Sequence, residues 1–447
     1  MTSRYFTECH YSRFSSGGRT NIYGLSILKT FMKSGLPRDQ EFPSNITKTL
    51  HDGDNNALVL NHQIHNNDDN NNDLGIDPQN PNYHIFISSF YGITCFVSAA
   101  GYWNTLELPL DNSIGEIISI EVFSTKSSIL ILSITTTGPE NNNLSDESRN
   151  NKFFLRIFSL TDDDDSSEMY IEEALFKVTE QCQLIELGFA PMQLLHSEIS
   201  HNGESFDGLM LCGTDGGIHL YTENEITKKW EERSIQQYYP LHAELGSCNS
   251  NVLSLEIKEF HDIKIIAAGC QNGTLYLSIM KKDLTTGNYV QVEELSSSVV
   301  LPSSITSICI FSSSTSKDKK LFNNPFFLSD CSEYDSVLCS NVMDVDWDGK
   351  NEIMVGTYGR ELLIYKQELI DDVNSFMRFK LLWKKSFAYP IYKIVGLDLN
   401  QDCINELIIV TQYGVHVLQP RLDKAKYILF KKLEELNKLY EEYKNLE

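Results

Sequence analysis

Residues 343–365 read MDVDWDGKNEIMVGTYGRELLIY, and the same pattern returns at residues 396–418 as GLDLNQDCINELIIVTQYGVHVL. Each copy begins with an acidic loop, continues into an apolar run, turns at a glycine and ends in a second apolar run. Equivalent loop positions are 54 residues apart. Repetition at such a spacing is typical of repeat proteins. Because repeat proteins mostly present binding surfaces, we expect the function to lie in partners rather than in chemistry.

The two acidic loops carry side chains of the type that binds a hard cation. The first loop has four candidate ligands at offsets 0, 2, 4 and 8, namely Asp344, Asp346, Asp348 and Glu352. The second loop keeps these offsets with Asp398, Asn400, Asp402 and Glu406, but has Cys403 where the first has Gly349. Alternating oxygen ligands around a glycine are typical of calcium loops. Aspartates can also cap a turn without any ion. We favour loops without a cofactor and keep calcium as the alternative.

Hairpins with a glycine at the turn recur along the chain, at Gly92, Gly216, Gly273, Gly359 and Gly414. We expect these glycines to supply the positive φ of tight turns. Gly216 and Gly273 are 57 residues apart, Gly359 and Gly414 are 55 apart, and the 322 residues from Gly92 to Gly414 divide into about six such intervals. The pattern therefore predicts an all-β fold, a β-propeller of about seven four-stranded blades that closes on itself and so removes its sheet edges.

Two segments interrupt this regular pattern within the predicted propeller, which spans residues 1–419. The segment from about Thr30 to Asn82 is rich in Asn and Asp and cannot bury enough apolar surface to order itself, so we predict a disordered insertion. Residues near 300–335 contain no glycine hairpin, which predicts an incomplete fifth blade.

Residues 420–447 show the spacing of an amphipathic helix that follows Pro420. Its apolar stripe recurs in steps of three and four and consists of Leu422, Ala425, Leu429, Leu433, Leu436, Tyr440 and Tyr443. Such a stripe must be buried. It packs either on the propeller itself or against a helical partner, and the sequence leaves both alternatives open.

Composition excludes several classes of function. The chain of 447 residues has 37 basic and 61 acidic residues, a net charge of −24, which disfavours nucleic acid and anionic membranes as direct partners. Ten scattered cysteines without a C-x-x-C pair suggest buried thiols in a reducing compartment. No leader or membrane-spanning run is visible, so we expect a cytoplasmic protein without membrane insertion. Known catalytic motifs are missing, which predicts that the chain is not an enzyme.

The residues also carry a resemblance to a known family. The loop with its hairpin resembles the FG-GAP repeat of integrin α propellers. The chain is more similar still to the kaptin family at SRFSSGGRTNIYGL (12–25), FAPMQLLHSEI (189–199), GCQNGTLYLS (269–278) and above all YDSVLCSNVMDVDWDGKNEIMVGTYGRELLIYK (334–366). The insertion at about 30–82 and the short fifth unit depart from that family's pattern.

The resemblance implies a scaffold subunit of a KICSTOR-like complex. Its partners would be a second FG-GAP propeller subunit, the other KICSTOR components and the GATOR complex, which acts on Rag GTPases. The chain would then be recruited to the lysosomal surface and would restrain TOR signalling when amino acids or glucose are scarce. The alternative that the family implies is association with actin in the cell cortex. Because actin is acidic, that alternative needs a basic patch, for which Lys424–Lys426 with Lys431 and Lys432, and Lys317–Lys320, are the candidates.

Overall fold

The computed structural model describes residues 5–14, 18–30, 32, 82–90, 92–99, 102–111, 114–125, 129–138, 152–160, 169–201, 203–243, 250–283, 285–311, 327–328, 331–369 and 377–444. The chain divides into two compact units. Unit 1 comprises Met1–Arg13, Phe311–Asp398 and Cys403–Glu447, and unit 2 comprises Phe14–Ile310 and Leu399–Asp402. Each unit has hydrophobic clusters of its own.

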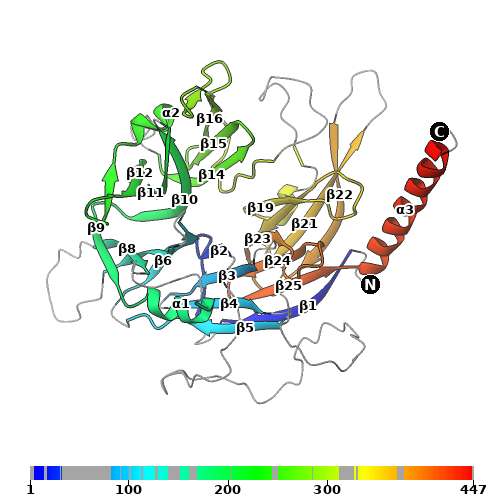
Figure 1. The fold of residues 1–447 in the computed structure, drawn as a ribbon, viewed down its shortest axis with the longest axis horizontal. Coiled ribbons are helices and arrows are strands. Elements are labelled where there is room, and N and C mark those ends of the chain that lie inside the picture. Colours follow the sequence, from blue (N-terminus) through cyan, green and yellow to red (C-terminus); the bar gives the residue numbers. More distant parts are fainter. Residues whose placement is uncertain are drawn as a thin grey trace, which may run out of the picture. The chain divides into compact units, whose positions relative to one another are not determined.

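Unit 2 contains four antiparallel sheets that follow one another along the chain (Figure 1). The first sheet consists of β2 (Leu25–Thr30), β3 (Asn82–Ser88), β4 (Ile93–Ala99) and β5 (Tyr102–Glu107). The second consists of β6 (Ile117–Ser124), β7 (Leu130–Thr137), β8 (Phe153–Ser159) and β9 (Cys182–Leu187). The third consists of β10 (Pro191–His201), β11 (Glu204–Gly213), β12 (Ile218–Glu223) and β13 (Trp230–Arg233). The fourth consists of β14 (Val252–Phe260), β15 (Ile263–Cys270), β16 (Thr274–Lys282), β17 (Tyr289–Gln291) and β18 (Ser297–Val300).

Unit 1 contains two further sheets and the longest helix. The fifth sheet consists of β19 (Val337–Met343), β20 (Glu352–Thr357), β21 (Glu361–Leu369) and β22 (Met377–Ser386). The sixth consists of β23 (Ile391–Leu397), β24 (Glu406–Thr411), β25 (Gly414–Pro420) and β1 (Phe6–Arg13). The helical elements of the two units are α1 (Ile171–Val178), η2 (Ile235–Gln237), α2 (Pro240–Ala243), η4 (Cys331–Tyr334) and α3 (Leu422–Lys444).

The sheets have the arrangement of propeller blades. Within each sheet the strand order follows the chain, apart from β1 and the divided outer strand β17/β18. In unit 2 the first strands of successive sheets, β2, β6, β10 and β14, contact one another in turn, and in unit 1 β19 contacts β23. The prediction of an all-β propeller with a C-terminal helix is therefore confirmed. The predicted number of about seven blades is wrong, because the described residues form six. Closure of the blades into one ring stays a prediction.

The miscount has a structural cause in the stretch between Gly273 and Gly359. This stretch connects the fourth sheet to the fifth, and it is longer than the other connections between sheets because of additional residues after β17. β18 pairs with β16, and the Leu301 N–H donates to Gly273 O at 2.8 Å. Ile308 and Ile310 then pack against the same sheet. Of the segment near 300–335, which we predicted to be an incomplete fifth blade, residues 300–310 thus pack on the fourth sheet, whereas Leu328, Cys331 and Tyr334 pack against the fifth sheet. The described residues of this segment add no sheet of their own.

The N-terminal strand β1 completes the last blade. It runs antiparallel to β25, with Phe6 opposite Pro420 and Arg13 opposite Gly414. Glu8 strengthens this pairing because its carboxylate lies 2.7 Å from Lys385 Nζ in β22 and 2.5 Å from His416 Nδ1 in β25. Two strands about 400 residues apart in the chain therefore lie side by side in one sheet of unit 1.

The predicted insertion begins and ends at a pair of facing residues. β2 ends at Thr30, which lies opposite Asn82, the first residue of β3. The Asn- and Asp-rich segment therefore connects two adjacent strands of the first blade. Residues 33–81 themselves lie outside the described part of the chain, so their predicted disorder stays a prediction.

The hairpin glycines serve two different purposes. Gly216 and Gly273 have φ values of 82° and 87°, as the turn prediction requires. At the next hairpin the positive φ belongs instead to Arg360, at 70°. Gly359 is required there by space, since a Cβ would lie 2.6 Å from Tyr334 O. The prediction of positive φ is therefore wrong for Gly359, and it is also wrong for Gly92 and Gly414.

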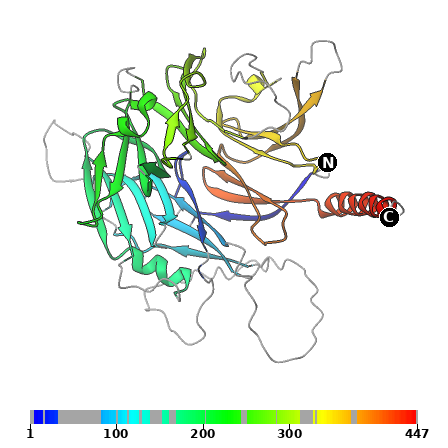
Figure 2. The same cartoon turned by 45° about the horizontal axis from the view of Figure 1, so that its top comes forward.

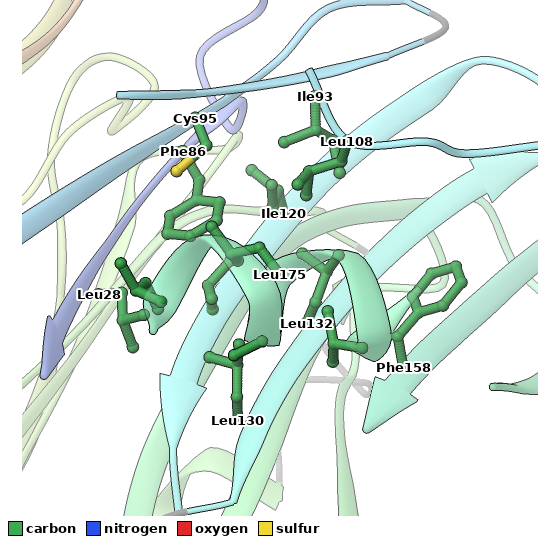
Figure 3. Close-up of a cluster of buried hydrophobic side chains, with 14 of the residues drawn as sticks. Leu28, Phe86, Ile93, Cys95, Leu108, Ile120, Leu130, Leu132, Phe158 and Leu175 are labelled. Atoms are coloured by element: carbon green, nitrogen blue, oxygen red, sulfur yellow. The ribbon is translucent and has the colours of Figure 1, made fainter. Parts of the chain in front are cut away.

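The short helix α1 closes the core of the first two blades. Its buried residues include Ala174, Leu175 and Val178. Figure 3 shows Leu175 among side chains of both sheets, such as Phe86 and Leu132. No periodic pattern had predicted this helix, which lies between β8 and β9.

Candidate functional site

The first acidic loop connects β19 to β20 and is held together by its own carboxylates. Asp344 accepts hydrogen bonds from the backbone N–H groups of Asp348 at 3.2 Å and Gly349 at 2.8 Å. Two residues of the loop have left-handed φ values, 57° at Trp347 and 85° at Gly349. The carboxylate therefore satisfies N–H groups that this sharp turn leaves without a backbone partner.

The other carboxylates extend the same capping. Asp348 Oδ1 accepts from the Lys350 N–H at 2.9 Å, and Glu352 Oε2 accepts from the Val345 N–H at 2.8 Å. Glu352 is the first residue of β20 and is only 1% exposed. Asp344, Asp348 and Glu352 therefore each cap the backbone of the turn, as the alternative without a bound ion predicts.

Lys366 supplies a positive charge to this loop. Its Nζ lies 2.6 Å from Asp346 Oδ2, 2.7 Å from Asp348 Oδ2 and 3.2 Å from Glu352 Oε1. The side chain comes from β21, where the register that sets Ile353 opposite Tyr365 makes Glu352 and Lys366 the next facing pair. A single ammonium group therefore joins three of the four predicted ligands.

The pKa values of the groups follow from burial and from this ammonium. Burial raises the pKa of Glu352, and the neighbouring Asp346 adds to the increase. Burial acts in the same direction on Asp348, but hydrogen bonds from Lys366 and from the Lys350 N–H hold the pKa of Asp348 below its usual value. For Lys366, burial acts to lower the pKa, but the carboxylates around it raise the pKa well above its usual value.

The ammonium of Lys366 bears directly on the calcium alternative. Asp344, Asp346 and Asp348 each offer an oxygen, and these oxygens lie within 4.8 Å of one another, as a cation site would require. Lys366, however, contacts two of these three side chains at hydrogen-bond distance. Because a divalent ion at the same oxygens would be repelled by the ammonium, the residues present fit an internal ion pair better than calcium.

The second loop, between β23 and β24, repeats the backbone of the first with different side chains. Asp398 Oδ2 accepts from the Cys403 N–H at 2.8 Å, as Asp344 does from Gly349. The left-handed residues are Gln401 at 60° and Cys403 at 65°. Asn400 Oδ1 accepts from the Asp402 N–H at 3.1 Å. Glu406 begins β24 and is 4% exposed, in the manner of Glu352.

The charge balance of the second loop differs from that of the first. Leu407 lies opposite Leu418, so the residue that faces Glu406 is Gln419. Where the first repeat has a lysine, the second therefore has a neutral amide. One of the acidic residues is also replaced, by Asn400.

A pocket of about 320 Å³ lies between the two loops within unit 1. Its wall combines apolar side chains such as Met343, Trp347 and Ile404 with the polar side chains of Asn351 and Asn405. Asp344 also lines it, but both oxygens of Asp344 accept backbone hydrogen bonds.

Histidines form pairs with carboxylates that link neighbouring strands. His196 in β10 bonds Asp207 in β11 at 2.8 Å and stacks on Phe123. His219 in β12 lies 2.9 Å from Asp215 and 2.7 Å from Glu232. These contacts give both histidines a structural role.

Helix α3 carries the predicted apolar stripe. Leu422 and Ala425 are half-buried at its start. Beyond the first two turns, the predicted stripe residues are between 51% and 61% exposed, namely Leu429, Leu433, Leu436, Tyr440 and Tyr443. In Figures 1 and 2, α3 leaves the end of β25, and no strand of unit 1 runs alongside it. Most of the stripe therefore does not pack on the sheets of unit 1, and its burial against a helical partner stays a prediction. Within the described residues, no helix is long and apolar enough to cross a membrane.

The main residue that sequence patterns missed is Lys366. Its signal was present, since a lysine ends the apolar run after the hairpin of the first repeat and a glutamine ends that of the second. Only the strand register shows that these positions face Glu352 and Glu406.

Comparison with known proteins gives a family. The family model described as KICSTOR complex protein kaptin matches residues 110–324 and 318–429. The mouse (Mus musculus) KICSTOR complex protein kaptin is 31% identical over 293 residues, which are 59% of this chain and 65% of the mouse protein. The match thus spans slightly less than two thirds of that relative.

A solved structure was also found, that of BBS1N in complex with ARL6DN. It covers 76% of this chain and 75% of its own, at 11% identity and a TM-score of 0.31, a score too low to support an argument. The family model, in contrast, covers well over half of the chain. Its match shows that the chain, with its six described blades, belongs to the kaptin family.

Proposed function

We propose that this chain is a non-enzymatic scaffold subunit of a KICSTOR-like complex. The observation that carries the proposal is the family match over residues 110–429, because the matching model and the mouse relative are both described as a KICSTOR complex protein. The geometry is compatible with this role, since the acidic loops form closed capping networks and the apolar face of α3 is exposed.

We also propose which proteins the chain binds and where in the cell it does so. The chain would bind a second FG-GAP propeller subunit and the other components of a KICSTOR-like complex, and through them the GATOR complex. Assembly would take place at the lysosomal surface, with restraint of TOR signalling in starvation as the outcome. Helix α3 is the element that we assign to protein binding, because its exposed leucines and tyrosines need a protein surface to leave water.

Affinity purification followed by mass spectrometry tests this proposal. The tagged full-length chain, purified from fed and amino-acid-starved cells, is expected to recover KICSTOR-like and GATOR components. Imaging of the same tagged chain is expected to show lysosomal recruitment. If none of these components is recovered under either condition, the proposal is wrong.

Association with actin is the second candidate, and a basic cluster favours it. Lys426, Lys431 and Lys432 are exposed on the first half of α3. The other candidate cluster, residues 317–320, lies outside the described part of the chain. Co-sedimentation of the purified chain with actin filaments tests this alternative, and Lys431→Glu with Lys432→Glu is expected to abolish any direct binding. Recovery of actin without complex components would reverse the order of the two candidates.

A further inference from the structure

Helix α3 exposes a continuous apolar face along most of its length. Eight large apolar side chains are between 51% and 69% exposed: Tyr427, Leu429, Phe430, Leu433, Leu436, Leu439, Tyr440 and Tyr443. A helix of 23 residues is about 34 Å long, and burial of such a face in a partner would stabilise it strongly. The sequence of the helix contains information about what that partner is.

Six apolar residues of α3 follow the heptad spacing of a coiled coil. Alternating steps of four and three place one seam at Leu422, Lys426, Leu429, Leu433, Leu436, Tyr440 and Tyr443. These positions correspond to alternating d and a sites over three heptads. Lys426 is the single charged residue in this seam.

The two halves of the helix carry opposite charge. Residues 422–433 contain four lysines and one aspartate, a net charge of +3, whereas residues 434–444 contain four glutamates and two lysines, a net charge of −2. An antiparallel copy of the same helix would bring each half against the opposite charge, and a parallel copy would bring like against like. From this self-complementarity we infer that α3 pairs antiparallel with α3 of a second copy of this chain.

The residues of the seam agree with that orientation. With the two-fold axis between residues 434 and 435, Leu433 meets Leu436 of the second copy and Leu429 meets its Tyr440. Lys426 then lies beside Tyr443 of the second copy, where its ammonium can lie over the ring. A parallel pair would instead place two Lys426 side chains in one layer, and their charges would repel each other.

The pairing deepens the proposed scaffold role, since a two-fold pair would present every partner surface of the chain twice. It is tested on the purified full-length chain by analytical ultracentrifugation. The wild type is expected to form dimers that dissociate on dilution, and Leu433→Glu with Leu436→Glu is expected to be monomeric at every concentration. Lys431→Gln with Lys438→Gln, on the opposite face of the helix, is the matched control and should remain dimeric.

Disulfide trapping tests the orientation. A chain with both Leu429→Cys and Tyr440→Cys is expected to form a covalent dimer on mild oxidation, beyond the background that wild type gives with its ten cysteines. Neither single variant should form this covalent dimer. In the antiparallel pair, two identical residues lie 11 positions apart, which is about 16 Å along the helix axis. Disulfides need Cα atoms within about 7 Å.

The outcomes separate this inference from the proposed function. A wild type that stays monomeric at about 100 µM would overturn the pairing, even if complex partners are still recovered from cells. Trapping by the single variants would overturn the antiparallel orientation. A dimer that recovers no KICSTOR-like partner would leave the pairing intact and refute the scaffold role.

Discussion

The two acidic loops, which follow β19 and β23, share one backbone conformation but balance their buried charge differently. Both loops cap their turn with the first aspartate, contain two left-handed residues and end in a buried glutamate. The first loop then offsets its carboxylates with Lys366, whereas the second replaces one carboxylate by Asn400 and faces its glutamate with Gln419. The comparison teaches that the shape of the repeat depends on backbone capping. Charge balance is added separately, from a neighbouring strand.

The strongest test of this comparison removes the cation from the first loop. Lys366→Met leaves Asp346 and the buried Glu352 close together without a positive charge, and we expect the free energy of unfolding to fall by about 3 kcal/mol. Urea unfolding measures the loss. Lys380→Met is the matched control, because its pair with Glu368 is exposed and should contribute less than about 0.5 kcal/mol. Equal losses in the two variants would contradict the role of Lys366.

Removal of the same lysine should leave a group of carboxylates that can take up calcium instead. We expect millimolar calcium to leave the melting temperature of the wild type unchanged and to raise that of Lys366→Met, because the three carboxylates that Lys366 contacts then lack a cation. Magnesium serves as the control ion, since it demands a smaller and more regular site. A wild type that calcium stabilises strongly would show that the ion, and not Lys366, balances the loop.

Acid should reduce the difference between the wild type and Lys366→Met. The pKa of Asp348 lies below its ordinary value of 3.8, so its contribution to stability is present above that pH and is lost as pH falls through the lowered value. In Lys366→Met, Glu352, whose pKa burial already raises above 4.5, takes up a proton at higher pH and relieves repulsion. Unfolding measured from pH 7 to pH 3 should therefore show the difference in unfolding free energy between the two proteins narrowing as the pH falls. A constant difference would mean that Lys366 acts by packing alone.

A smaller effect is expected from substituting the equivalent left-handed residues of the two loops, Gly349 and Cys403. Gly349 has φ 85° with open space around its Cβ position, so Gly349→Ala should cost about 1 kcal/mol through backbone strain alone. Cys403 holds the same position in the second loop at 65°, and Cys403→Gly should stabilise the protein by about 0.5 kcal/mol. Chemical denaturation of both variants checks the opposite signs. Changes of the same sign would show that the two backbones are not equivalent.

The smallest expected effect comes from transferring the cation. Gln419→Lys places an ammonium opposite Glu406 and should stabilise the second repeat by about 0.5 kcal/mol at low salt, with the gain reduced at high salt. Gln419→Met is the uncharged control of similar length. A gain shared by both variants would indicate packing rather than charge.

The sequence alone predicted the repeating blade and its turns because those signals are local. The alternating apolar runs and the glycines at 216 and 273 act within one hairpin, where the residues that interact are neighbours in the chain. The predicted number of blades was wrong because an average spacing cannot separate a blade from a connecting segment such as residues 301–310, which packs on the fourth sheet. Helix α1 was missed because its eight residues are too few for a clear period.

The sequence predicted a turn capped by acidic residues, but it did not predict the lysine that balances their charge. The spacing of Asp344, Asp346, Asp348 and Glu352 is a local pattern and correctly marks a turn. Lys366 enters that turn from the next hairpin strand, and only the register of β20 against β21 brings it there. The exposure of α3 depends on what the rest of the chain leaves uncovered, which no periodicity within the helix encodes.

The placement of β1 beside β25 has a consequence for synthesis on the ribosome. Phe6 emerges first, but its partner Pro420 is translated more than 400 residues later. At about 5–20 residues per second, the nascent N-terminus remains unpaired for roughly 20 to 80 seconds. A polypeptide released before Pro420, by a nonsense codon or a stalled ribosome, lacks β25 and cannot pair its β1 strand. Completion of this blade therefore distinguishes molecules that extend through Pro420 from those truncated before it, and the unpaired β1 segment of a truncated product is open to chaperones and proteases.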